Sequence, residues 1–282
     1  MSDNRDTKST NEWIIANFGK INTKEIDPIA VSNKRKKLLF EKGFDIIVDE
    51  INDIIFNSLN KGIYWKLLNK QIIEHSNYYN INPQEIYDWL SNNPNDSNSI
   101  FLFGYFNYHG IGVSEDVERA YNLFIDVSHV SGKIHTLAQC FIGECYEYGY
   151  GIIKDEELAF EYYEKVANKN FAYGQLRIGY CYYNEIGIEK DLKMAYYWYE
   201  KAAKNGNLLA MQNLGLFYQD GIGVEKDYNK AFELFEQSSK GGCLEGICSL
   251  GYFYEHGIGT KIDKKKALEL YQKAANLGNE VA

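Results

Sequence analysis

The stretch AYYWYEKAAKNGNLLAMQNLGLFYQDGIGVEKDYNKA, residues 195–231, decides the fold of this 282-residue chain. Ala195, Tyr199 and Ala202 have the i, i+4, i+7 spacing of one face of an α-helix. A second apolar segment then leads to a pair of glycines and to Asp227. Because glycine accepts the positive φ that ends helices and aspartate caps helix N-termini, the stretch predicts helix, turn and helix.

The same pattern recurs along the chain. An apolar residue followed by glycine occurs at 103–104, 142–143, 178–179, 214–215 and 250–251, at intervals of 39, 36, 36 and 36 residues. In each unit an aspartate follows the glycine turn and an alanine follows four residues later, the aspartates being Asp116, Asp155, Asp191, Asp227 and Asp263. One such unit cannot bury its apolar faces alone, so the units must stack.

We therefore predict an all-α solenoid of about five units. Each unit consists of a helix A, a glycine turn and a helix B that starts after the aspartate cap. The small residues of helix B would let helix A approach closely. The aromatic residue between them, such as Tyr199, is expected to fill the gap toward the neighbouring unit.

These residues resemble the Sel-one-like repeat family, relatives of the tetratricopeptide repeats, as in AYYWYEKAAKNGN (195–207) and NLGLFYQDGIGVEKDYNKA (213–231). The resemblance covers residues 98–282 and implies a right-handed superhelical α-solenoid that serves as an adaptor for protein complexes. The expected repeats are 98–135, 136–171, 172–207, 208–243 and 244–279, with the start of a sixth at GNEVA (278–282). The first unit departs from the family at Asn107, where the family has tyrosine, and is expected to be an N-terminal cap. The third has Glu185 where the first turn glycine is expected.

The region before the repeats divides into a polar segment, residues 1–30, predicted to be poorly ordered, and a helical region, residues 31–97, predicted to pack on the array. Apolar spacing predicts antiparallel helices at about 34–59 and 63–78, and the basic run KRKK (34–37) is interpreted as a solvated helix start or a nuclear address. A third helix should begin with Asn82 as cap and Pro83 in its first position, with Trp89 and Leu90 against the first repeat.

This region also resembles the segment that precedes such repeats in some fungal proteins that carry a protein-kinase-like domain. The chain has no HRD or DFG signature, so it contains no kinase domain of its own. A regulatory fragment of a longer, kinase-linked repeat protein in signalling is therefore an alternative function.

Composition excludes several classes of partner. The net charge is −9 and basic residues are not clustered in long stretches, which argues against nucleic acid. No stretch approaches 18 uncharged apolar residues, so no membrane span is expected. The polar N-terminus lacks the apolar core of a secretory signal. We predict a cytoplasmic protein, with the nucleus as the alternative; its oligomeric state is open.

The sequence offers no catalytic or metal-binding motif. The five cysteines lack a CxxC pair and are expected to be buried thiols, and the five histidines have no metal-ligand spacing. The glycine pairs precede aspartate and follow a helix, unlike a phosphate loop. We expect no cofactor, no metal and no enzymatic activity; a hydrolase hidden in the groove is the less favoured reading.

A partner is expected on helix A. By analogy with tetratricopeptide arrays, positions one, four and five residues after the helix A glycine line the inner wall. The residues expected to form this groove are Tyr105, Tyr108, Glu144, Glu147, Tyr148, Tyr180, Tyr183, Gln219, Asp220, Tyr252, Glu255 and His256. Tyrosines with carboxylates suit a protein or peptide that bears a basic segment, unless the tyrosines only pack between units. A non-catalytic scaffold or adaptor is the function predicted.

Overall fold

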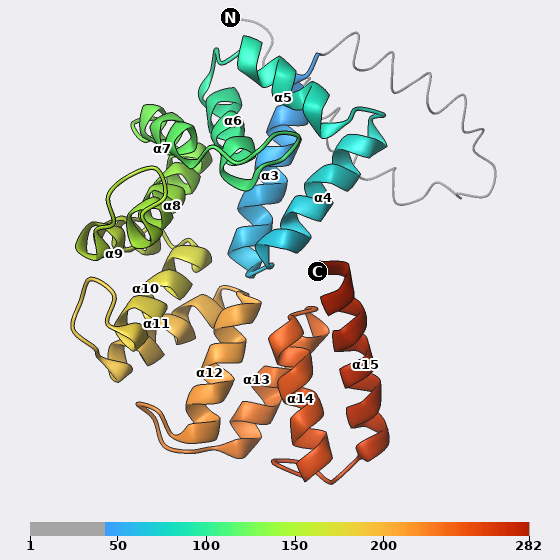
Figure 1. Ribbon diagram of the computed structural model, residues 1–282. Helices are drawn as coiled ribbons and strands as arrows, with labels where there is room; N and C mark the ends of the chain where they lie inside the picture. Colours follow the sequence, from blue (N-terminus) through green and yellow to red (C-terminus); the bar gives the residue numbers. More distant parts are fainter. Residues whose placement is uncertain (1–42, 282) are drawn as a thin grey trace, which may run out of the picture. The chain divides into compact units, whose positions relative to one another are not determined.

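The computed structural model describes residues 43–281, and within this range every regular element is an α-helix. The predictions for residues 1–30 and for the basic run at 34–37 lie outside the described residues. Figure 1 shows the thirteen described helices. They are α3 (Asp45–Lys61), α4 (Trp65–Tyr78), α5 (Pro83–Asn92), α6 (Ser97–His109), α7 (Val117–Asp126), α8 (Lys133–Tyr148), α9 (Glu156–Ala167), α10 (Ala172–Asn184), α11 (Leu192–Lys204), α12 (Leu208–Asp220), α13 (Tyr228–Lys240), α14 (Leu244–His256) and α15 (Lys264–Val281).

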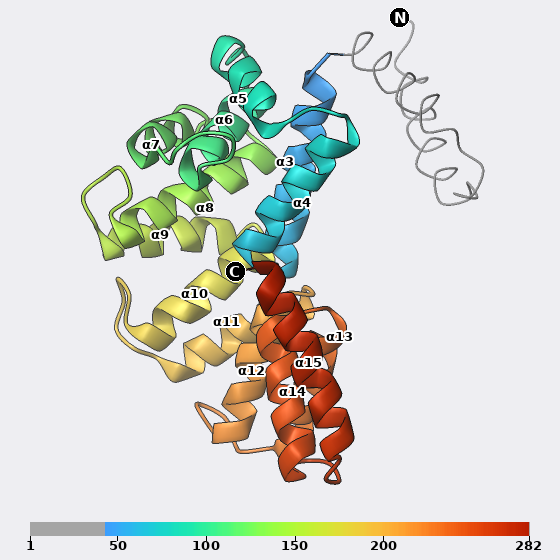
Figure 2. The same cartoon turned by 45° about the vertical axis from the view of Figure 1, so that its right-hand side comes forward.

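From α6 onward the helices form pairs in which an A helix packs against the following B helix, and successive pairs stack one after another (Figures 1 and 2). The predicted all-α solenoid is thus confirmed. The aspartates cap the B helices as expected: the carboxylates of Asp116, Asp155, Asp191, Asp227 and Asp263 accept hydrogen bonds from backbone N–H groups in the first turn. Such caps satisfy donors that have no partner within the helix.

The helix A glycine is the contact point within each pair. A Cβ added at Gly215 would lie 2.5 Å from the ring of Phe235, and one added at Gly179 would lie 2.7 Å from the ring of Tyr199. The aromatic residue of helix B therefore packs on the glycine of its own unit. It also reaches the neighbouring unit, as predicted: the ring of Tyr199 lies 5.5 Å from that of Phe217 and the ring of Phe235 lies 5.0 Å from that of Phe253. The missing side chain on helix A leaves room for the ring within its own unit.

The two turn glycines have different tasks. Gly221 ends α12 with φ +73° and donates its N–H to Phe217. Gly223 also has positive φ, but a Cβ there would lie 2.6 Å from the carbonyl oxygen of Leu192, at the start of the preceding B helix. Of the glycine pair, Gly221 is therefore the helix cap, and Gly223 permits close packing of backbone on backbone.

The third turn keeps this geometry without its first glycine. Glu185 ends α10 with φ +62°, the same left-handed conformation that Gly221 adopts. Side chains other than glycine adopt this conformation at a cost of about 1–2 kcal/mol. The rest of the repeat therefore imposes the turn on an unsuitable residue.

The helices before the repeats follow the sequence prediction in the described residues. In α5, Asn82 and Glu85 form a reciprocal capping box and Pro83 is the first helical residue. Leu90 is buried, but the ring of Trp89 stacks on Phe44, at 5.3 Å between ring centroids, rather than on the first repeat. Tyr87 contacts α6 instead, because its ring packs on Phe103. Tyr87 follows the helix cap Asn82 by five residues, as Phe232 follows the cap Asp227 in the B helix α13.

Helix α3 lies beside the starts of the A helices. The side-chain oxygen of Asn60 accepts a hydrogen bond from the N–H of Ala172 at 2.7 Å, and its carbonyl oxygen accepts one from Asn207 at 3.2 Å. The Phe56 ring contacts Phe171. The first three A helices thus have a neighbour that is not part of the repeat pattern.

Two further expectations need correction. Four cysteines are buried, but Cys248 is exposed because it faces outward on α14. The last helix does not end at Gly278, where a new unit was expected, but continues to Val281. The equivalent glycines, Gly206 and Gly242, have positive φ and directly follow the C-caps of their helices, whereas Gly278 is within a helix.

Candidate functional site

The predicted groove residues of the first repeat are covered. Tyr105 is fully buried, and its hydroxyl donates a hydrogen bond to Asn69 of α4 at 2.8 Å. The Trp65 ring of α4 stacks on His109, at 5.5 Å between centroids. Tyr108 is also buried. Because Tyr105 is buried against α4 and Tyr108 against α8, neither forms the open binding surface that the sequence suggested.

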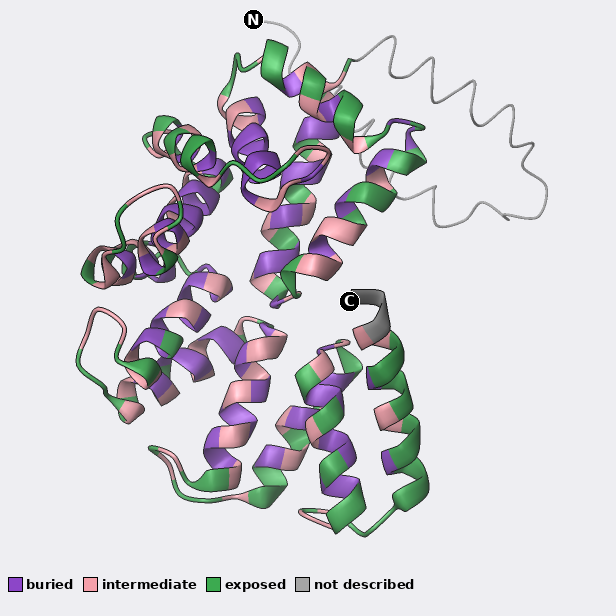
Figure 3. Cartoon of the chain, viewed as in Figure 1, coloured by how far each residue is buried: buried purple, intermediate pink, exposed green. Residues whose placement is uncertain are grey.

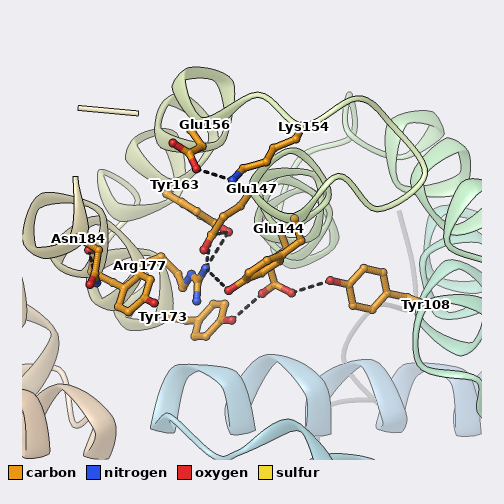
Figure 4. A network of polar contacts seen from close by, with 11 residues as sticks. Tyr108, Glu144, Glu147, Lys154, Glu156, Tyr163, Tyr173, Arg177 and Asn184 are labelled. Carbon is orange, nitrogen blue, oxygen red and sulfur yellow. Dashed lines mark hydrogen bonds and ion pairs between the residues drawn. The ribbon is translucent and has the colours of Figure 1, made fainter. Parts of the chain in front are cut away.

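The first acidic residue of the predicted groove is bound within the molecule. Glu144 of α8 accepts hydrogen bonds from the hydroxyls of Tyr108 at 3.1 Å and Tyr173 at 2.6 Å (Figure 4). Burial raises the pKa of Glu144, while the charge of Arg177 opposes this shift. The carboxylate therefore joins α6, α8 and α10 and has little capacity left for a partner.

The second acidic residue belongs to a buried ion pair. Glu147 is 5% exposed, forms an ion pair with Arg177 of α10, and accepts a hydrogen bond from the Tyr163 hydroxyl at 2.7 Å. The guanidinium also donates to the hydroxyls of Tyr163 and Tyr148 and lies 5.3 Å from the ring centre of Tyr180. Figure 4 shows Glu147, Tyr163 and Arg177 pointing toward one another between neighbouring helices.

The charge of Arg177 is retained despite its burial. Burial by itself lowers the pKa of Arg177, but the oxygens of Tyr163, Tyr173 and Glu147 outweigh it, so the pKa lies above its ordinary value. Two of the acidic residues that were expected to attract a basic partner, Glu144 and Glu147, thus face an arginine of the same chain.

Sequence reasoning missed Arg177, Tyr163 and Tyr173. A signal for Arg177 was present, because it precedes Tyr180 by three residues and Asn184 by seven, the spacing of one helical face. No sequence pattern identifies Tyr173, whose contact with Glu144 depends on how neighbouring units pack.

In the later repeats, most side chains at the same helix A positions, one, four and five residues after the helix A glycine, are exposed or partly exposed to solvent. Tyr180 is 38% exposed and Tyr252 is 46% exposed, although either could have packed between units. Tyr183, in contrast, is partly buried and its ring contacts Phe217 of the next A helix. We call the accessible residues of this register the open A surface; they are Tyr148, Tyr180, Gln219, Asp220, Tyr252, Glu255 and His256.

The polar groups of the open A surface have local partners. Glu255 accepts a hydrogen bond from the Tyr271 hydroxyl at 2.8 Å, and Gln219 donates one to Asp220 at 3.2 Å. The rings of Tyr252 and His256 lie 4.2 Å apart. These side chains are held at the surface and remain exposed or partly exposed, so a partner could contact them without breaking the core.

The described residues contain no group of three or more metal-ligating side chains. None of the described helices has the combination of length and hydropathy that a transmembrane span requires. A pocket of about 350 Å³ lies away from the open A surface, beside the α3–α4 turn and the starts of α12 and α14.

Burial lowers the pKa of His109 to about 3, so this ring is neutral at ordinary pH.

Comparison with known proteins assigns the family. The Sel1 repeat profile matches residues 97–125, 136–171, 172–207, 208–243 and 244–279. The chain therefore belongs to the Sel1 repeat family, whose members generally mediate protein–protein interactions as non-catalytic scaffolds. No sequence among the curated proteins matches it.

Two solved structures are similar. A Sel1 repeat protein from Oxalobacter formigenes is 29% identical, with a TM-score of 0.57, over 74% of this chain and 79% of that one. The protein c5321, a protective antigen of uropathogenic Escherichia coli with an SLR fold, is 22% identical, with a TM-score of 0.60, over 81% of this chain and 49% of that one. The second likeness concerns the fold alone.

Proposed function

We propose that this chain is a non-catalytic scaffold that binds a protein or peptide partner in the cytoplasm through the open A surface, as part of a concave groove. The supporting observation is the contrast within one register. In α6 and α8, Tyr105, Tyr108 and Glu147 are buried and Tyr148 is the exposed member. In α12 and α14 the corresponding residues are exposed or partly exposed.

The chemistry of this surface favours a partner with a basic segment. Asp220 and Glu255 are exposed carboxylates, whereas Glu147 is already paired with Arg177. Tyr180 and Tyr252 can bury a ring face and still form hydrogen bonds at the ring edge. A lysine or arginine beside an apolar residue would match both features.

The test is a quantitative pull-down with a double charge reversal, Asp220→Lys with Glu255→Lys. Both residues are exposed, so the variant should fold normally. Its matched control is Glu157→Lys with Glu233→Lys, which reverses two exposed carboxylates on the B helices α9 and α13. Proteins recovered with the unmodified chain should be lost with the first variant and retained with the control.

Salt gives an independent readout, because screening weakens contacts between exposed charges. Affinity for the recovered partner should fall with ionic strength in the unmodified chain and depend less on it in the Asp220/Glu255 variant. Loss of the partner in the B-helix control alone would show that the opposite surface binds it, and the proposal would be wrong.

A further inference from the structure

Helix α15, the last described helix, has a surface that its counterparts bury. Repeat spacing places Leu268 of α15 at the position of Phe232 in α13, Tyr196 in α11 and Phe160 in α9. Those three aromatic residues are partly buried, whereas Leu268 is 65% exposed. Figure 3 shows exposed residues along most of α15, and Figure 2 shows this helix as the last of the stack.

The neighbouring repeats show what covers this position elsewhere. In each case it contacts a tyrosine of the next A helix. The Phe232 ring lies 5.4 Å from Tyr254, and the Tyr196 ring lies 5.9 Å from Tyr218, with 2.7 Å between the two hydroxyl oxygens. Leu268 has the same place on its helix and no such cover among the described residues.

A second position shows the same difference. Ala275 is exposed, while its counterparts Ala203 and Ser239 are 8% and 4% exposed. What covers Ser239 is a small residue of the next A helix: a Cβ added at Gly246 would lie within 3.1 Å of the Ser239 backbone nitrogen. The covering helix must therefore have a small side chain at this point.

The five A helices of this chain share that requirement. Five residues before the helix A glycine, each has a small residue, namely Ser99, Ala138, Gly174, Ala210 and Gly246. Seven residues after the small one comes an apolar side chain, and eight residues after it comes tyrosine in every unit but the first. The Phe253 ring at the apolar position lies 5.0 Å from Phe235 of the preceding B helix.

We propose that the outer face of α15, formed by Leu268, Tyr271 and Ala275, binds an A-type helix of a partner protein. The recognised helix has a small residue, an apolar residue seven positions later and a tyrosine eight positions later. The interface continues the four B-to-A interfaces already present between the repeats. It meets the open A surface at the hydrogen bond from Tyr271 to Glu255, but its contacts do not require a partner bound at that surface.

Among the described residues, a second copy of the chain has no free A helix that could fit this site. The helices α8, α10, α12 and α14 each lie between two B helices of the same chain. The remaining A helix, α6, is covered by α5, where the Tyr87 ring lies 5.2 Å from Phe103. Head-to-tail stacking of identical chains is therefore blocked at α5.

The experiment uses a fluorescent, stapled peptide of residues 244–256, the sequence of α14, as the probe. Isolated helices of this length are marginal in water, and a staple replacing Cys248 and Tyr252 enforces the helix at two exposed positions. Fluorescence anisotropy with the full chain should show saturable binding. A peptide with Gly246→Leu should bind far more weakly, because the added side chain meets the backbone of the docking helix.

Two matched variants of the full chain locate the site. Leu268→Glu should weaken peptide binding by about tenfold or more, because a carboxylate replaces apolar contact area. Ile262→Glu makes the same change at a 64% exposed loop residue and should leave the affinity within about twofold. Both replace exposed side chains, so both should retain the helical melt.

Several outcomes would overturn this inference. The first is that the peptide does not bind. The second is that the Leu268→Glu variant binds it with the affinity of the unmodified chain. The third is that Ile262→Glu weakens binding as much as Leu268→Glu does. Sedimentation velocity of the full chain provides a further one. Self-association that Leu268→Glu abolishes would assign the face to a second copy of the chain instead.

Discussion

The A helices of the first two repeats and those of the last two present the same register to different surroundings. In the first pair of A helices, Tyr105 is covered by α4 and Glu147 is paired with Arg177. In the last pair, Asp220 and Tyr252 face outward. A repeat pattern thus specifies where a side chain lies on its helix, while its exposure depends on neighbours that the repeat does not encode.

The largest effect is expected at the buried ion pair. Arg177→Ala would leave Glu147 buried without its charge partner, and we expect the free energy of unfolding to fall by about 3 kcal/mol or more. The exposed counterpart Asp220→Ala should change it by less than about 0.5 kcal/mol. Chemical denaturation measures both. Equal, small effects would show that the network in the first repeats is not buried as described.

The next effect separates backbone strain from close packing in the turns. Gly223→Val should destabilise the chain by about 2 kcal/mol or more, because the residue has positive φ and its Cβ would meet the Leu192 carbonyl oxygen. Gly206→Val is the matched control, since Gly206 has φ +86° but no atom within 4 Å of an added Cβ. The difference between their unfolding free energies measures the packing contribution, and equal losses would contradict it.

The smallest change in stability is expected from exchanging the helix-ending residues of the third and fourth turns, Glu185 and Gly221. Glu185→Gly should stabilise the chain by about 1 kcal/mol, because glycine adopts the left-handed conformation without steric strain. The reverse change, Gly221→Glu, should destabilise it by a similar amount. Thermal melts of the two variants should move in opposite directions. A lower melting temperature for Glu185→Gly would contradict this account, because it would mean that a contact of the glutamate side chain stabilises the chain by more than the left-handed conformation costs.

Much of the fold could be predicted from the sequence because its determinants are local and repeated. Asp227 caps a helix and Gly221 ends one for reasons that lie within a few residues of each. The position of α3 beside the starts of the A helices is different, since it depends on contacts such as Asn60 to Ala172, 112 residues apart. No periodicity reports a contact of that kind.

For the candidate site, the sequence predicted which helix A positions its residues hold, but not which of them are exposed. Tyr180, Asp220 and Tyr252 are exposed where the register placed them. The burial of Tyr105 could not be foreseen, because α4 has no repeat pattern that would align it with α6. The consequence for experiment is direct: replacing Glu144 and Glu147 by lysine would damage folding as well as binding, so those residues cannot test the groove.

The central claim is that one register is sealed in the first repeat and open in the fifth. Tyrosine nitration of the native chain, followed site by site with mass spectrometry, tests it through Tyr105 and Tyr252, which hold the same position in their repeats. Burial raises the pKa of Tyr105 well above its ordinary value and removes its ring from solvent, whereas Tyr252 is 46% exposed. The account predicts rapid nitration of Tyr252 with Tyr105 protected until the chain unfolds. Equal nitration rates in the native state would contradict it.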